Sequence, residues 1–425
     1  MCPEPKSVTC GDALIWIWGA ALIAGLIFDS ELFAASAWIG AMTWIGALSM
    51  VFVLASFPHA AAIFVRTLVV LFALIPASAR GAANHTLRVS LASELRYDSL
   101  ATASGDFAGK LLPSLGYARQ SERSRLDLDY GLTLTHPLRA GSLLVDHRSE
   151  LRLRLTATRR LAIDANGALY RVAQSTSLPR FGVAYAEAGA FWSFLNLNAR
   201  TRLSRASTLD IAARSEWNAL LIDNAPVSGT NNLQISWRHR AFRRVELGLG
   251  LRGQLFSAER AISGNSLALL FVSRFVLSPH ATLRLDLGPR LYRASGQSAW
   301  DAQVRLQLDW ARRGWQLALI AGRDYVGAAG FASTLWTEFV QGGFGVQLTR
   351  ALRLFGYLGA FRNGLAARHQ ADAIGYGASL GVEWEIAEQM QWRLAYDRLG
   401  QSGAADTGLD MGRDIVTLRF GYQFI

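Results

Sequence analysis

The amino-acid sequence predicts an all-β protein: a transmembrane, antiparallel, up-and-down outer-membrane β-barrel of about 18 strands (16–18), preceded by an apolar N-terminal segment. Three observations predict this fold. From residue 84 to the last residue, hydrophobic and polar side chains alternate in segments of about 10–14 residues, long enough to cross a bilayer when tilted. Short and longer connections alternate between these segments. Tryptophan recurs near the segment ends, where aromatic girdles of a membrane barrel lie.

The stretch RLDLDYGLTLTH, residues 125–136, illustrates the alternation. Leu126, Leu128 and Tyr130 share one face of the expected strand, while Arg125 and Asp127 share the other. The barrel interpretation places the leucines against lipid and the charges in an aqueous lumen. A water-soluble β-sandwich would also alternate, but a chain of this length would then need a second domain boundary, and none is visible.

The connections set the strand count. Eight short ones are expected near 121–123, 158–160, 205–207, 242–243, 278–280, 311–313, 349–350 and 387–389. Nine longer ones are expected near 99–105, 137–146, 172–182, 222–230, 257–263, 293–298, 326–333, 363–372 and 400–410. Seventeen connections join eighteen strands, an even number as in bacterial barrels, with both termini in the periplasm. None of these loops is expected to be long enough to fold deeply into the lumen.

Tryptophan positions add to the membrane interpretation. Trp300 and Trp310 stand at the two ends of one apolar face. A further set is expected at the bilayer interfaces: Trp192, Trp217, Trp237, Trp315, Trp384 and Trp392.

The chain before the barrel has a different character. Residues 1–65 form an apolar extension, helical if it is present in the natural product. Residues 66–83 read as a signal peptide, because Arg66 precedes TLVVLFALIP and an Ala-Ser-Ala cleavage pattern ends at Ala79. Translation from Met50 would leave residues 1–49 out of the protein; a membrane-embedded extension is the competing interpretation. The barrel domain is expected over residues 84–425.

Composition excludes several function classes. The formal charge of +11 comes mostly from arginines scattered along the alternating segments, so nucleic acid is not an expected partner. Cys2 and Cys10 match no zinc spacing, and the seven histidines form no metalloprotease or other catalytic pattern. We therefore predict no catalytic residues, cofactor or metal. An outer-membrane hydrolase, with His and Asp or Ser on the lumen wall, is the less favoured alternative.

Candidate functional residues lie on the polar face of the segments and are expected to line the lumen: Arg125, Asp127, Asp129, Arg152, Arg154, Arg214, Glu216, Arg252, Arg284, Asp286, Arg290, Arg305, Asp309, Tyr292, Tyr357 and Arg419. Opposite charges on neighbouring strands, such as Asp127 beside Arg152 and Asp286 near Arg305, favour a ladder of cross-strand ion pairs over a dedicated anion filter.

The C-terminal segment GRDIVTLRFGYQFI carries aromatic residues at Phe420, Tyr422 and Phe424. These resemble the C-terminal strand that the outer-membrane barrel-assembly machinery recognises, which would make that machinery a partner. The chain departs from the usual signal because Ile425, and not an aromatic residue, is last.

Two stretches, YDSLATASGDFAGKLLPSLGYARQSERSRLDLDYGLTLTH (97–136) and DHRSELRLRLTATRRLAIDANGALYR (146–171), resemble the β-barrel porin 2 family. The early Tyr-Asp element of that family is incomplete here, since Ser99 and Leu100 follow Asp98. The resemblance implies a Gram-negative outer-membrane barrel, in contact with outer-membrane lipid, and for some members polysaccharide-export partners. The expected function is a passive pore or export-associated barrel for hydrophilic solutes or glycans; a non-conducting scaffold for a surface assembly is the alternative.

Overall fold

The structure is a computed structural model. It describes residues 84–99, 106–138, 143–174, 188–222, 225, 227–258, 261–294, 297–327, 334–365, 373–403 and 410–424. The expected extension over residues 1–65 and the expected signal peptide over 66–83 lie outside the described residues and stay predictions.

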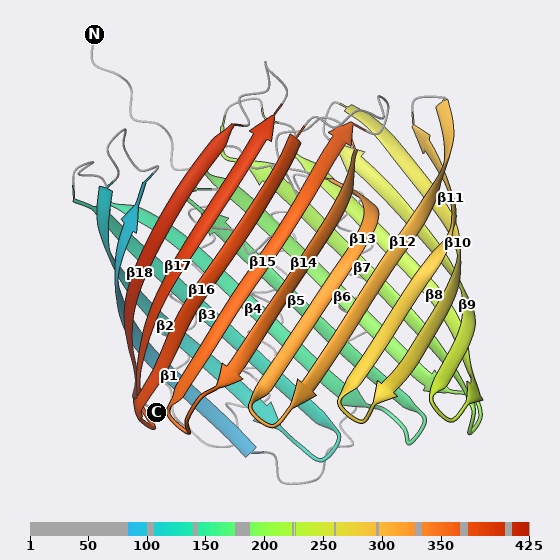
Figure 1. Cartoon of the computed structure of the whole chain (residues 1–425), viewed down its shortest axis with the longest axis horizontal. Helices are drawn as coiled ribbons and strands as arrows, with labels where there is room; N and C mark the ends of the chain where they lie inside the picture. The colour runs from blue at the N-terminus through green and yellow to red at the C-terminus, as the bar shows by residue number, and fades with distance from the viewer. Residues whose placement is uncertain are drawn as a thin grey trace, which may run out of the picture. The chain divides into compact units, whose positions relative to one another are not determined.

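Eighteen β-strands form one antiparallel sheet (Figure 1). They are β1 (Asn84–Asp98), β2 (Asp106–Gln120), β3 (Ser124–Pro137), β4 (Leu144–Thr156), β5 (Leu161–Val172), β6 (Ala190–Arg202), β7 (Ser207–Leu220), β8 (Ser228–Phe242), β9 (Val245–Ala258), β10 (Ala261–Ser278), β11 (Ala281–Ala294), β12 (Gln297–Arg312), β13 (Trp315–Val326), β14 (Leu335–Gln347), β15 (Leu352–Leu365), β16 (Ala373–Ala387), β17 (Met390–Gly403) and β18 (Met411–Gln423). Each strand pairs with its sequence neighbours, and β1 also pairs with β18, so the sheet closes. The predicted 18-stranded up-and-down barrel is confirmed.

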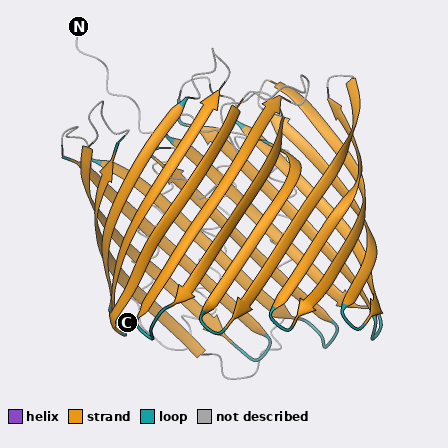
Figure 2. Ribbon diagram, in the orientation of Figure 1, coloured by secondary structure: helices purple, strands orange, loops and turns teal. Residues whose placement is uncertain are grey.

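The connections sort to the two ends of the barrel (Figure 2). We call the end with residues 121–123, 157–160, 203–206, 243–244, 279–280, 313–314, 348–351 and 388–389 the short-turn end, and the opposite one the long-loop end. The longest connection, residues 173–189, joins β5 to β6. In the part of the chain that the structure describes, no helix has the length and hydropathy to cross a membrane.

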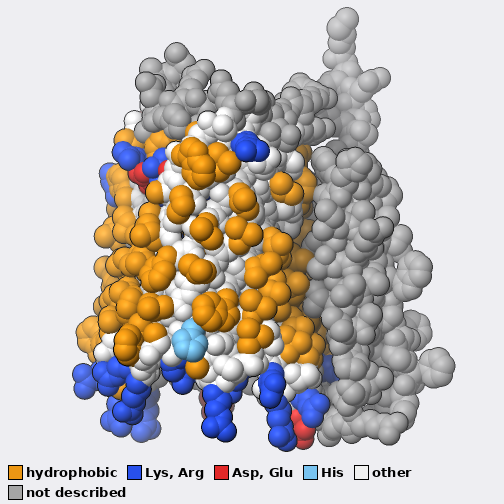
Figure 3. All heavy atoms as spheres, turned by 90° about the vertical axis from the view of Figure 1, so that its right-hand side faces the viewer, with side chains coloured by type: hydrophobic (Ala, Val, Ile, Leu, Met, Phe, Trp, Pro, Cys, Tyr) orange, Lys and Arg blue, Asp and Glu red, His pale blue; other side chains and the backbone are white. Residues whose placement is uncertain are grey.

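The outer face of the barrel is apolar. Mid-strand leucines are widely exposed there, Leu358 by 66 % of its surface, and Trp300 near the long-loop end is 75 % exposed. Figure 3 shows one side, with hydrophobic side chains over the strands and basic side chains at the short-turn end. An exposed apolar surface of this extent is unfavourable in water and favourable in lipid, and the tryptophans Trp315, Trp384 and Trp392 add an exposed aromatic set near the short-turn end.

Trp192 was expected at a bilayer interface, and the structure places it on the inner face instead. It lies opposite Tyr170 on β5 and Asn218 on β7, and its indole is only 5 % exposed. The ring stacks on Tyr170 with the centroids 5.2 Å apart, and its Nε1 donates to Glu216 Oε1 at 3.0 Å. A position near a strand end does not reveal the face, which only the parity of the strand determines.

Candidate functional site

The inner face of the barrel is the candidate site. The strand register places all sixteen predicted lumen residues on the face opposite the exposed leucines. For example, Tyr357 precedes the exposed Leu358, and Arg252 follows the exposed Leu251. Arg290 and Tyr292 are buried on this face, because other side chains cover them.

Ion pairs line this face, many of them between neighbouring strands as expected, but the two expected pairs Asp127–Arg152 and Asp286–Arg305 do not form. Asp127 binds Arg125 Nε at 2.8 Å, two residues away on its own strand, although Arg152 lies directly opposite. Residues at i and i+2 of a strand share a face, so a same-strand pair competes with the cross-strand one. Asp286 and Arg305 lie opposite each other in register and form no direct ion pair.

Other predicted lumen residues pair along or between neighbouring strands. Asp129 binds Arg88 at 3.1 Å, Arg152 binds Glu150 at 3.2 Å, Arg154 binds Asp164 at 2.7 Å, Arg214 binds Glu216 at 2.7 Å and Arg284 lies 3.9 Å from Asp309. Because most of these side chains are also in contact with solvent, each pair contributes about 0.2–1 kcal/mol at most. Their main consequence is a polar, largely charge-paired wall.

One pair of strands leaves this wall and enters the lumen. The pairing of β12 with β13 ends at Val304–Arg323, whereas the pairing of β13 with β14 continues to Val326–Leu335. Residues 297–303 of β12 therefore pair only with β11. We call residues 324–327 and 334–337, at the long-loop ends of β13 and β14, the inward hairpin.

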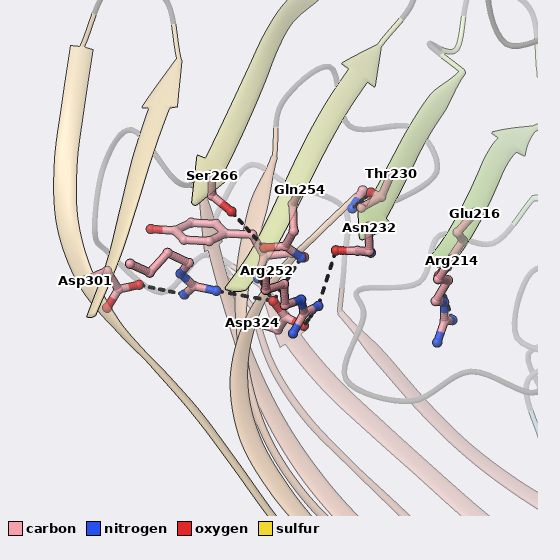
Figure 4. A network of polar contacts seen from close by, with 12 residues as sticks. Arg214, Glu216, Thr230, Asn232, Arg252, Gln254, Ser266, Asp301 and Asp324 are labelled. Carbon is pink, nitrogen blue, oxygen red and sulfur yellow. Dashed lines mark hydrogen bonds and ion pairs between the residues drawn. The ribbon is translucent and has the colours of Figure 1, made fainter. Parts of the chain in front are cut away.

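Asp324 anchors the inward hairpin to strands that are not its neighbours (Figure 4). Its carboxylate accepts hydrogen bonds from Arg252 Nη2 at 2.6 Å and Gln254 Nε2 at 3.1 Å, both on β9, and from Arg290 Nη1 at 3.2 Å on β11. Arg290, which is completely buried, also donates to Asp301 Oδ2 at 2.8 Å on β12. A buried guanidinium needs such compensation, because desolvation of an unpaired charge is costly.

The hairpin reaches across to β7 and β8. The backbone N–H of Gly327 donates to Thr230 Oγ1 at 3.0 Å on β8, and Asn218 Nδ2 on β7 donates to the Gly327 carbonyl at 3.4 Å. Gly327 suits this approach, because a Cβ there would lie 3.0 Å from Thr230 Oγ1. At the long-loop end, the inward hairpin thus divides the space bounded by β8–β13 from the rest of the lumen.

Aromatic side chains fill the space behind the hairpin. Phe256, Tyr292, Tyr325 and Trp336 form a buried cluster, in which Tyr292 and Tyr325 stack with their centroids 4.5 Å apart. The Arg290 guanidinium lies 4.1 Å from the Tyr325 ring centroid. Side chains therefore occupy the space between the inward hairpin and strands β9 and β11 at this level.

Two strand ends, and not a loop, narrow the lumen here, and the expected loop lengths gave no sign of this. Asp324 was also missing from the predicted set. The sequence signal that could have found Asp324 is its neighbour Arg323. Along the alternating strand, Arg323 occupies a position on the same side as the lipid-facing residues, yet it is charged and binds Asp301 at 3.3 Å. A charge on the lipid-facing parity indicates that the strand has left the bilayer surface.

A second contact spans the lumen near the long-loop end. Arg413 on β18 forms a buried ion pair with Asp98 on β1 and donates from Nη2 to Gln174 Oε1 at 2.8 Å. Gln174 follows the end of β5, so four strands of the wall lie between it and β18. Asp146 on β4 accepts from the backbone N–H of Ala173 at 2.6 Å. These contacts hold residues 173 and 174, at the start of the longest connection, at the inner face of the barrel.

In the part of the chain that the structure describes, no group of three His, Cys, Asp or Glu side chains is arranged to hold a metal ion. The polar residues of the wall are engaged mainly with one another and with solvent. The arrangement is a polar lumen inside a barrel with an apolar outer face. The inward hairpin narrows this lumen at the long-loop end.

Comparison with known proteins gives structural similarity only. No family model matches the chain, and no curated protein sequence matches it. The outer-membrane protein OpdK of Pseudomonas aeruginosa is 10 % identical with a TM-score of 0.40, covering 80 % of this chain and 99 % of its own. OccK2 (OpdF) of the same organism, in complex with glucuronate, is 9 % identical with a TM-score of 0.44 over 80 % and 99 %. The siderophore receptor PirA, also from P. aeruginosa, is 12 % identical with a TM-score of 0.40 over 81 % of each chain.

Proposed function

We propose that the protein is a passive outer-membrane pore for small hydrophilic solutes. The observation that carries this proposal is the division of the closed sheet into two faces, an exposed apolar outer face and a charged inner face. A lipid-embedded wall with a polar lining lowers the cost of moving a hydrated solute across a bilayer. The inward hairpin limits this passage to solutes smaller than the full lumen.

Conductance across planar bilayers tests the proposal directly. The folded, purified barrel is expected to give discrete conductance steps in potassium chloride. Complete absence of steps from a barrel that resists denaturation on a gel, as folded barrels do, would overturn the pore proposal. That outcome would favour a non-conducting scaffold barrel, with the inward hairpin as part of a closed lumen.

Two more specific hypotheses about the function accompany this proposal. The family resemblance over residues 97–136 and 146–171 supports membership of the β-barrel porin 2 family and a role in polysaccharide export with export-system partners. Co-purification with periplasmic export components tests this hypothesis. The less favoured hydrolase alternative predicts lipid or peptide cleavage by the purified barrel.

We also propose Gram-negative outer-membrane insertion with both termini in the periplasm, which places the short-turn end there. The exposed Phe424 packs against Tyr422, with centroids 4.8 Å apart, and Phe420 packs against Trp392 at 5.2 Å. This supports an aromatic C-terminal strand that the assembly machinery binds. Protease accessibility of a tag inserted in a short turn, in intact cells, tests the orientation.

A further inference from the structure

A single row of charged lumen residues crosses six neighbouring strands. In register, Arg353 on β15 faces Glu383 on β16, which faces Arg393 on β17, which faces Arg419 on β18. Arg419 faces Glu94 on β1, and Glu94 faces Lys110 on β2. The row begins at the second residue of β15, beside a short turn, and ends near the long-loop end of β2. It therefore follows the wall through most of the height of the barrel.

The two carboxylates of the row are already engaged. Glu383 lies 3.6 Å from Arg353 Nη1 and 3.5 Å from Arg393 Nη1, so two arginines share it. Glu94 is bound to Lys110 Nζ at 3.1 Å, and both side chains are largely buried. Arg419, which stands between these two groups, makes no ion pair or hydrogen bond with its guanidinium among the described residues, although it is half-buried.

Arg393 and Arg419 are thus like charges placed directly opposite each other. Directly opposed residues of an antiparallel pair have Cβ atoms about 4.5–5.5 Å apart, and like charges there are destabilising. A structural role would favour a carboxylate or amide at one of the two positions, as at the neighbouring Glu383. An arginine pair without an intervening acid has its surplus charge available to a mobile anion.

The surroundings of Arg393 hold its guanidinium away from the wall. The guanidinium carbon lies 4.4 Å from the centroid of the Phe355 ring. That ring in turn packs against Gly381, where a Cβ would lie 2.3 Å from Phe355 Cζ. Gly381, Phe355 and Arg393 are therefore stacked in this order from the wall toward the lumen. Stacking on an aromatic face leaves the N–H groups of a guanidinium free to donate in the ring plane.

We propose that Arg393 and Arg419 together bind an oxyanion, a carboxylate or phosphate group of a solute in the lumen. The guanidinium fork matches both groups, and an oxyanion bound between two such forks would neutralise part of the positive charge that the row leaves uncompensated. This site rests on the proposed function only in requiring a water-filled lumen. It would give an anionic solute a binding position partway along the passage.

Binding of inorganic phosphate and of formate to the purified barrel in detergent, followed by ³¹P and ¹H NMR line broadening, tests the site without any conductance measurement. We expect Arg419→Gln to weaken binding of both probes about tenfold, since it removes charge-assisted hydrogen bonds to the anion. Arg419→Lys keeps the charge and loses the fork, so an intermediate loss is expected. Loss with phosphate alone would assign the site to phosphate, and loss with formate alone to carboxylates.

Arg202→Gln is the matched control. Arg202 is a lumen-side arginine at the end of β6 that faces Thr208, not a second arginine, so its removal changes the net charge equally. It should leave binding unchanged. Equal effects of Arg202→Gln and Arg419→Gln would show a general charge effect and overturn the site, as would no effect of Arg419→Gln.

Two further measurements test the anion site and a structural role of Arg419 separately. Glu383→Gln releases two arginines from their shared carboxylate and should strengthen phosphate binding severalfold, whereas weaker binding would contradict the proposal. Arg419→Gln should leave the thermal unfolding temperature unchanged or raise it, because it removes a like-charge contact; a fall would indicate a structural role. A barrel that binds phosphate at Arg419 without conducting would overturn the pore and keep the site.

Discussion

The inward hairpin is predicted to depend on the charge of Asp324. Asp324→Asn keeps the size of the side chain and removes the negative charge that lies between Arg252 and Arg290. Removing one partner of a buried ion pair costs about 3–5 kcal/mol. Arg290 retains Asp301 at 2.8 Å and Arg252 retains Asn232 Oδ1 at 3.3 Å, so the lower end of that range applies. About 3 kcal/mol corresponds to roughly a hundredfold increase in the population of detached hairpin.

Single-channel recording is the assay. Detachment joins the space behind the hairpin to the main passage, so Asp324→Asn is expected to add a larger conductance level or frequent transitions to it. Asp309→Asn is the matched control, because Asp309 is 41 % exposed on its side chain and 3.9 Å from Arg284. Such a pair contributes about 0.2–1 kcal/mol. Identical conductance levels and thermal unfolding temperatures for wild type and Asp324→Asn would refute the anchoring role.

Other predictions concern the wall itself. Leu358→Arg, on the mid-strand outer face, should cost about 2–4 kcal/mol of stability in urea unfolding from lipid vesicles, whereas Ser379→Arg on the inner face should be tolerated; equal costs would contradict the face assignment. Gly381→Ala should destabilise the barrel by about 1–3 kcal/mol in thermal unfolding, because its Cβ would lie 2.3 Å from the Phe355 ring and 2.8 Å from a backbone oxygen. Gly412→Ala, where nothing lies within 4 Å, should change little; a comparable loss at Gly412 would mean that backbone freedom, and not space, matters.

The sequence predicted the architecture because a membrane barrel repeats one local rule. Alternation with period two, the length needed to cross a bilayer and the order of short and long connections are local properties, each readable from neighbouring residues. The strand count and nearly every turn followed from them. The face of a side chain followed equally well in the middle of strands, as at Leu128 and Asp127. It failed at Trp192, which was placed by its nearness to a strand end and not by the parity that it shares with Asn196 and Asn198.

The candidate site was predictable only in its composition. The sequence shows that Arg252, Arg290 and Asp286 belong to the inner face. Which of two competing partners an ion pair selects depends on the register between strands, which is not encoded locally. The opposition of Arg393 and Arg419 likewise depends on where β17 meets β18. The chain itself contains no sign of that alignment, since a shift of two residues would preserve every hydrophobic face.

By itself, then, the sequence determined that this chain closes a barrel of about 18 strands with its apolar face outward, because burial of backbone hydrogen bonds and contact with lipid impose a period of two. Only the tertiary structure decided where the passage is narrowed. Asp324 meets Arg252 and Arg290 because β13 leaves the wall after Arg323, and contacts across a lumen join residues far apart in sequence. Such contacts follow from the path of the backbone in space, which local alternation leaves undetermined.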